Sequence, residues 1–191
     1  MQKEVHIVVI RRTSQKNVWL AKMKNWARDR KMIFEMCVLS VLFIAQIVFF
    51  VVYFSYGKIL MLKYGGWFIL ILSAIFGWLP IYTFRKKGKV PKGKSYVHTT
   101  ELVTSGVYSV VRHPQFLAGI LLSLWFFLVS QHWSVLVLGI PVMVIFYKDM
   151  FEADRSNIEK FGEAYASYMK EVPRMNFILG LIRIMKKKLM I

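Results

Sequence analysis

Cysteine and acidic residues are both scarce in this sequence. The 191 residues include a single cysteine, Cys37, which excludes an internal disulfide framework and a metal site built from several thiolates. Asp and Glu number 10 against 27 Lys and Arg, so the net charge is +17. A basic excess suits either nucleic acid or a membrane surface, and the position of the charges has to decide between them.

The motifs of several soluble enzyme classes are also missing. The 11 glycines are scattered without a Gly-x-Gly-x-x-Gly or phosphate-loop pattern, which excludes a Rossmann domain and related nucleotide-binding folds. The four histidines, His6, His98, His113 and His132, are nowhere paired at helical spacing, so we expect no metal. No serine lies in a nucleophile elbow.

Hydrophobic residues, in contrast, are abundant. They make up 57% of the chain, and the mean hydropathy of +0.46 is high for a soluble domain. The apolar residues gather in four runs, at 32–56, 65–84, 116–130 and 133–150. The last two are close to the minimum length for a membrane crossing and predict a tilted helical hairpin. We therefore predict an all-α integral membrane protein with four to five transmembrane helices.

Basic residues between the runs predict how the chain is oriented. Lys and Arg cluster in residues 1–31 and 85–94, whereas the connection 57–64 holds two of them and the turn at 131–132 none. By the positive-inside rule the termini and the central loop face the cytosol. Four crossings then bring residues 100–114 and everything after 151 to this same face. The basic segments suit anionic lipid headgroups, which we expect as partners in place of nucleic acid.

The C-terminal part has an amphipathic pattern. Apolar side chains recur at three to four residue steps at Ile158, Phe161, Tyr165, Tyr168 and Met169. This spacing predicts a cytosolic helix that ends near Pro173. Residues 177–184, followed by three lysines, predict a further interfacial helix, since a fifth crossing there would carry the lysines outside. We divide the single structural domain into residues 1–94, with the first hairpin, and residues 95–191, with the candidate catalytic region.

A polar segment at residues 100–119 interrupts the apolar runs. Its Arg112 and His113 precede Pro114, which stops a helix from running back through the pair. The predicted cluster comprises Tyr108, Arg112 and His113, together with Glu152, Asp154 and Arg155 at the end of the fourth run. Ionisable groups at a membrane boundary are costly unless paired or solvated, so their concentration predicts a functional site. Interfacial anchoring by long side chains is the alternative.

Three motifs follow one another in the second half of the chain. They are Leu-Val-Thr-Ser-Gly-Val-Tyr at 102–108, Arg-His-Pro-Gln-Phe-Leu-Ala-Gly at 112–119, and Lys-Phe-Gly-Glu-Ala-Tyr-Ala-Ser-Tyr with Val-Pro-Arg within 160–174. In this order they resemble the isoprenylcysteine carboxyl methyltransferase family of integral membrane enzymes. The same superfamily includes phospholipid N-methyltransferases, so the motifs indicate the reaction more specifically than the substrate.

The resemblance implies that S-adenosylmethionine binds on the cytosolic side and is converted to S-adenosylhomocysteine. The implied cofactor-binding residues are Thr100, Glu101, Leu102, Val103, Tyr108, His113, Pro114, Gln115, Phe116 and Asp154. The family often has histidine at the position of Thr100, tyrosine at that of Phe116, and a glutamate pair where Ala153 and Asp154 stand. These departures leave open which of Glu152 and Asp154 contacts the cofactor.

The implied substrate is the C-terminal carboxylate of a prenylated cysteine, entering from the bilayer. A carboxylate with a pKa of about 4 is ionised at neutral pH, so the enzyme needs alignment and exclusion of water but no general base. Arg112 is a candidate for orienting a carboxylate. An amine substrate would need a proton acceptor, for which Glu152 and His113 are candidates. N-methylation of a lipid amine and a non-enzymatic membrane anchor or subunit are the alternative functions.

Overall fold

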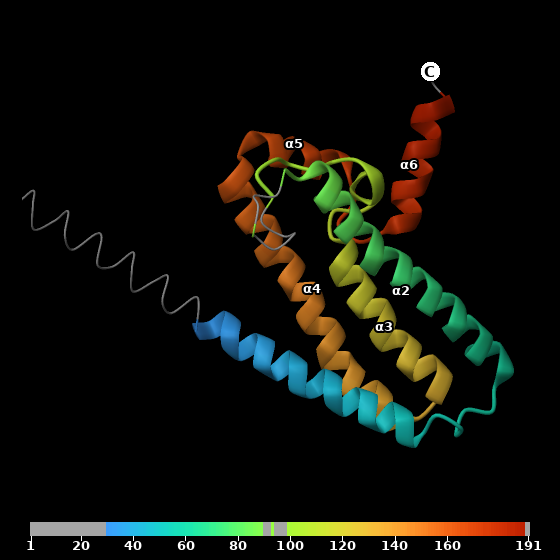
Figure 1. Cartoon of the computed structure of the whole chain (residues 1–191). Helices are drawn as coiled ribbons and strands as arrows, with labels where there is room; N and C mark the ends of the chain where they lie inside the picture. Colours follow the sequence, from blue (N-terminus) through green and yellow to red (C-terminus); the bar gives the residue numbers. More distant parts are fainter. Residues whose placement is uncertain (1–29, 90–92, 94–98, 190–191) are drawn as a thin grey trace, which may run out of the picture. The chain divides into compact units, whose positions relative to one another are not determined.

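The computed structural model describes residues 30–89, 93 and 99–189, and every regular element in this part of the chain is helical (Figure 1). After a first helix, Arg30–Val52, come α2 (Leu60–Lys87), the 3-10 turn η1 (Gly106–Ser109), α3 (Pro114–Ser130), α4 (Trp133–Phe161), α5 (Glu163–Glu171) and α6 (Phe177–Leu189). The predicted all-α class is confirmed for these residues. Most of the predicted basic segment 1–31 and of residues 90–98, including the division at 94, lies outside them.

Among the residues that the structure describes, three helices are long and apolar enough to cross a membrane: Arg30–Val52, α2 and α4. The apolar helix α3 has 17 residues and is therefore about 26 Å long, somewhat less than the roughly 30 Å of a hydrocarbon core. A membrane protein with three candidate spans and one shorter apolar helix follows from these lengths. The number of crossings and their orientation stay predictions.

Two prolines lie inside helices without ending them. Pro80 is buried within α2, which continues to Lys87, and Pro141 lies within α4, which continues to Phe161. A proline removes only one backbone bond, and neighbouring helices in a bundle compensate for it. Both helices therefore continue past their prolines, and α4 extends well beyond the predicted limit at residue 150.

The predicted amphipathic helix is divided in two by Gly162. Ile158 and Phe161 belong to α4, whereas Tyr165 and Tyr168 belong to α5. Gly162 has φ +56°, in the left-handed region that glycine adopts without strain, so the chain changes direction there. The helix ends at Glu171, close to the predicted limit at Pro173.

Contacts divide the chain into two units, residues 1–41 and 42–191. In the described part of the first unit, Lys31 and Glu35 form an ion pair of 3.8 Å one helical turn apart. Within the second unit, α2 packs on α3 and α3 packs on α4 (Figure 1). The buried residues of its largest apolar cluster are Phe76, Val103, Val107, Tyr108, Val111, Leu117, Ala118 and Leu121, which join α2, α3 and the segment between them.

A neutral polar cluster lies within the apolar helices of the second unit. The fully buried Gln46 donates from Nε2 to the carbonyl oxygens of Ser123 (3.1 Å) and Val135 (3.2 Å), and Ser123 Oγ donates to Gln46 Oε1 (3.0 Å). A Cβ added to Gly139 would collide with Gln46 Nε2, so glycine permits this close approach. We call Gln46, Ser123, Val135 and Gly139 the Gln46 cluster.

Candidate functional site

The segment between α2 and α3 is held by backbone and lysine contacts at its start. Thr100 donates from its backbone N–H to the Gly88 carbonyl (3.0 Å) and from Oγ1 to the Lys89 carbonyl (2.9 Å). Lys160, on α4, donates from Nζ to the Thr99 carbonyl (2.5 Å). Further along, the chain turns at η1, and Val107 and Val111 are buried there. The chain then enters α3.

The C-terminal segment between α5 and α6 pairs with the end of this connection. The backbone N–H of Arg112 donates to the Pro173 carbonyl (3.0 Å), and that of His113 donates to the Arg174 carbonyl (3.3 Å). On α5, Tyr168 donates its hydroxyl to the Tyr108 carbonyl (2.5 Å). Two segments about sixty residues apart in sequence are thereby joined at the C-terminal end of α4.

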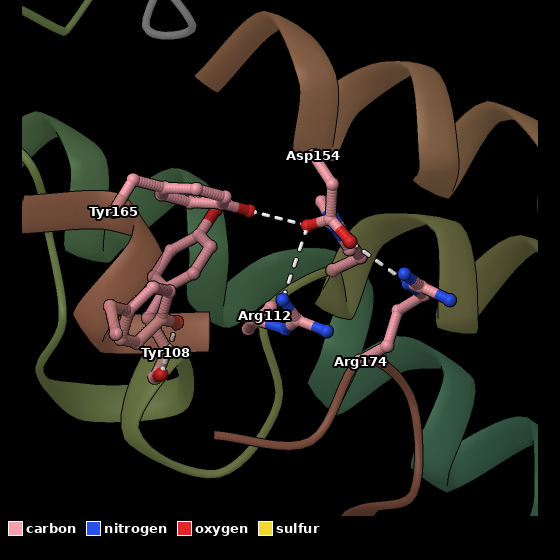
Figure 2. Close-up of polar contacts among 7 residues, drawn as sticks. Tyr108, Arg112, Asp154, Tyr165 and Arg174 are labelled. Atoms are coloured by element: carbon pink, nitrogen blue, oxygen red, sulfur yellow. Dashed lines mark hydrogen bonds and ion pairs between the residues drawn. The ribbon is translucent and has the colours of Figure 1, made fainter. Parts of the chain in front are cut away.

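Asp154 lies at the centre of this junction, on α4, and is only 4% exposed. Its Oδ1 accepts hydrogen bonds from His113 Nε2 and the Tyr165 hydroxyl, both at 2.6 Å, and lies 3.6 Å from Arg112 Nη1. Its Oδ2 accepts from Arg174 Nε at 2.9 Å. Figure 2 shows Tyr165, Arg112 and Arg174 converging on the carboxylate from three different segments. We call these five residues the Asp154 cluster.

The Asp154 cluster carries an excess of positive charge. Two guanidinium groups surround one carboxylate, and the hydrogen bonds from His113 and Tyr165 favour the ionised form of that carboxylate. The Arg112 side chain is buried, yet its Nε and Nη1 have no hydrogen-bond partner in the described part of the chain. Buried donors are usually satisfied, so Arg112 retains capacity to bind an acceptor group.

The two tyrosines of α5 remain hydrogen-bond donors over a wide pH range. Burial raises the pKa of Tyr165 above its ordinary value, and the hydrogen bond to Asp154 raises it further. Burial likewise raises the pKa of Tyr168, and the neighbouring Tyr165 adds to the effect. Both hydroxyls therefore hold their protons at neutral pH and keep their acceptors, Asp154 and the Tyr108 carbonyl.

Some of the predicted site residues meet in this cluster. Arg112, His113 and Asp154 are brought together as predicted, and Phe116 lies beside them with its ring centroid 5.8 Å from that of His113. Pro114 is buried at the first turn of α3, and Gln115 is half-buried beside it.

Other predicted residues lie in different surroundings. The buried ring of Tyr108 stacks on Phe84, 4.6 Å between centroids, and Figure 2 shows it apart from the Asp154 carboxylate. Val103 belongs to the largest apolar cluster, and Leu102 packs against Tyr165, Tyr168 and Val172. Thr100 and Glu101 are exposed, and Glu101 forms an ion pair of 2.5 Å with Lys89.

Glu152 and Asp154 differ sharply in environment. Side chains two positions apart on one helix point to different faces of that helix. Of these two, only Asp154 faces α5 and the C-terminal segment. Glu152 is exposed. Of the two carboxylates left open by the sequence, Asp154 is the one in contact with Arg112 and His113.

Sequence reasoning missed two members of the Asp154 cluster as site residues. The spacing predicts Tyr165 only as part of the apolar side of an amphipathic helix, and Arg174 is noted only as part of the Val-Pro-Arg motif. The guanidinium of Arg174 also lies over the Phe151 ring, 3.9 Å from its centroid, which fixes its position beside Asp154. The sequence signal for both residues is their place in the third motif and its Val-Pro-Arg.

Comparison with family models, with curated proteins and with solved structures finds no match. The relation to methyltransferases therefore stays a prediction from the three motifs. The structure adds that residues of the second and third motifs meet at Asp154.

Proposed function

We propose that this chain is an integral membrane S-adenosylmethionine-dependent methyltransferase that methylates the C-terminal carboxylate of a prenylated cysteine. The observation that carries the proposal is the meeting of the second and third motifs at one carboxylate. Arg112 and His113 come from the second motif, and Tyr165 and Arg174 come from the third with its Val-Pro-Arg, and all four contact Asp154. The predicted orientation, with this cluster on the cytosolic side, is part of the proposal.

The donor set of the cluster fits the cofactor's amino-acid end. When bound, S-adenosylmethionine would supply an electrophilic methyl group for transfer to an oxygen nucleophile. Arg112 offers two buried donors without hydrogen-bond partners among the described residues, and a guanidinium binds a carboxylate well. Arg112 would bind a carboxylate, His113 and Tyr165 would hold Asp154 in place, and Asp154 would keep the Arg112 side chain oriented.

The engagement of His113 by Asp154 supports a carboxylate acceptor over an amine. An amine must lose a proton before or during methyl transfer, which requires a base within reach. His113 Nε2 is engaged by Asp154, and Glu152 is exposed. A carboxylate is already ionised at neutral pH and needs no such base. The exposed apolar side chains of the helices would let a prenyl tail approach from lipid.

Two measurements on purified protein test the proposal in sequence. Calorimetric titration with S-adenosylhomocysteine is expected to show binding, and Arg112→Ala to weaken it by about tenfold or more. Arg155→Ala is the matched control, because Arg155 is exposed and directly follows Asp154. Absence of binding to the wild-type protein would rule out the enzymatic function and favour an anchor or subunit.

The acceptor is then identified with radiolabelled S-adenosylmethionine and two substrates, a farnesylated cysteine and phospholipid vesicles. Label released by base as a volatile methyl product identifies a carboxyl ester and supports the proposal. Label that stays base-stable in the phospholipid fraction identifies lipid-amine methylation and overturns the carboxylate assignment while leaving the methyltransferase reaction intact.

A further inference from the structure

Helix α6 is held to the rest of the unit along one side. The Phe177 ring lies 5.5 Å from that of Phe76 on α2, and Arg183 donates from Nη2 to the Ser109 carbonyl at 2.9 Å. Between them, Gly180 is buried so closely against Val110 that an added Cβ would collide with its carbonyl oxygen. Positions 177, 180 and 183 recur every three residues, so a single side of α6 makes these contacts.

The neighbouring side of α6 is apolar and exposed. Its residues are Ile178, Leu181, Ile182, Met185 and Leu189, which are between 38% and 86% exposed. At about 100° per residue they form one stripe roughly 100° wide along the helix. We call these five residues the α6 stripe. Left in water, such a continuous stripe would be unfavourable, and it marks a surface that something covers.

Lysines border the α6 stripe on both sides. On a helical projection Lys186 falls about 40° beyond one edge of the stripe, and Lys188 falls about 20° beyond the other. The sequence of α6 contains Arg183 and three lysines and no acidic residue. An apolar stripe between flanking lysines is the arrangement that lets a helix bury its apolar side in acyl chains while its ammonium groups reach headgroups.

The start of α6 lies beside the apolar part of a candidate membrane span. Phe76 precedes the end of α2 at Lys87 by eleven residues, or about 16 Å along that helix. From Phe177 to Lys186 the distance along α6 is about 14 Å. Figure 1 shows α6 diverging from the flank of α2. A helix that starts at this depth and diverges from the bundle can bring its lysines near the level where Arg85, Lys86 and Lys87 close α2.

We propose that α6 docks on an anionic lipid surface, with the α6 stripe at the boundary of acyl chains and headgroups and Lys186 and Lys188 bound to anionic headgroups. Charge decides against a second copy of α6 as the covering partner, because two helices without acidic residues would bring six lysines together. The contact of Phe177 with the buried Phe76 fixes the start of α6 against α2, a candidate membrane span, and so holds the stripe beside it.

The test uses the full chain in nanodiscs, which leave both membrane faces open to reagents. With Cys37→Ser to remove the lone cysteine, Leu181→Cys or Met185→Cys is introduced and labelled with a membrane-impermeant maleimide. In nanodiscs of phosphatidylcholine with phosphatidylglycerol, both cysteines are expected to react about tenfold more slowly than in phosphatidylcholine alone. Ser167→Cys, at an exposed position of α5, is the matched control and should react equally fast in both lipids.

A charge reversal separates headgroup binding from other causes of slow labelling. Lys186→Glu with Lys188→Glu is expected to restore fast labelling at position 181 in the anionic nanodiscs. Equal labelling rates in the two lipids would overturn the proposal. Slow labelling in both, unaffected by the charge reversal, would point to a protein cover over α6 and would overturn it as well.

Discussion

Two buried polar clusters of opposite kinds lie in the described part of the chain. The Gln46 cluster lies among apolar helices and uses only neutral groups, whose donors are satisfied by Ser123, Val135 and Gln46 itself. The Asp154 cluster lies where α4 meets α5 and the C-terminal segment, and it uses a carboxylate, two guanidinium groups and an imidazole. One cluster is saturated within the described residues, and the other leaves two donors of Arg112 without acceptors.

The difference shows where this chain accommodates buried charged side chains. In a hydrocarbon environment an ionised side chain is expensive, so a buried contact between spans is made with amide and hydroxyl groups at little electrostatic cost. At the end of α4, separate segments supply cations to a single carboxylate, which makes a charged cluster sustainable. The saturated cluster joins apolar helices with neutral groups alone, whereas the unsaturated one retains donors that can bind a ligand.

The largest effect is expected for Asp154→Ala. It leaves Arg112 and Arg174 without their shared counter-ion, and breaking a buried ion pair from one side costs about 3–5 kcal/mol. Thermal unfolding in detergent should show a large loss of stability. Glu152→Ala, two residues earlier and exposed, should change the free energy of unfolding by about 0.5 kcal/mol or less. Similar effects of the two substitutions would contradict the central place of Asp154.

Tyr165→Phe is expected to have the next largest effect. It removes a hydrogen bond to a charged acceptor, worth about 1.5–3 kcal/mol, whereas Tyr168→Phe removes one to the neutral Tyr108 carbonyl, worth about 1 kcal/mol. Unfolding measured on both variants should preserve this order. Because its pKa is raised in the folded state, Tyr165 contributes stability below about pH 10 that is lost as the pH rises further, and the variant should be less sensitive to alkali.

Gly139→Ala tests the packing of the neutral cluster. The added Cβ would collide with Gln46 Nε2, and overpacking typically costs about 1–3 kcal/mol. Binding of S-adenosylhomocysteine, if present in the wild-type protein, should be unchanged, since the two clusters share no residue. Gly65→Ala on α2 is the matched control, because an added Cβ there meets nothing within 4 Å. A loss of stability in the control as large as in Gly139→Ala would remove the steric explanation.

Gln46→Leu is expected to have the smallest effect. Side-chain hydrogen bonds between membrane helices contribute about 0.6 kcal/mol on average, and Ser123 Oγ keeps the Gly139 carbonyl as an acceptor. Unfolding in the same detergent should therefore show only a slight change. If this variant lost as much stability as Asp154→Ala, the neutral cluster would contribute as much to the free energy of unfolding as the charged one, and the contrast between them would be wrong.

Much of the local structure was predictable, because its causes lie within short stretches of sequence. Long apolar runs predicted the helices Arg30–Val52, α2, α3 and α4, since only a helix satisfies its backbone groups over such a run. Pro114 predicted where α3 begins, because proline is favoured in a first turn. The extension of α4 to Phe161 was missed, since the polar residues after Met150 end the apolar run without ending the helix.

By itself, the sequence determined the helical class, the candidate spans and the polar segment that holds Arg112 and His113, because run length and proline position act locally. Only the tertiary structure decided that Asp154, and not Glu152, meets that segment, and that Tyr165, Arg174 and Gln46 have partners far away in the chain. The physical reason is that a partner depends on which helix faces come together. A turn of the helix of about 200° between residues 152 and 154 separates an exposed carboxylate from a buried one.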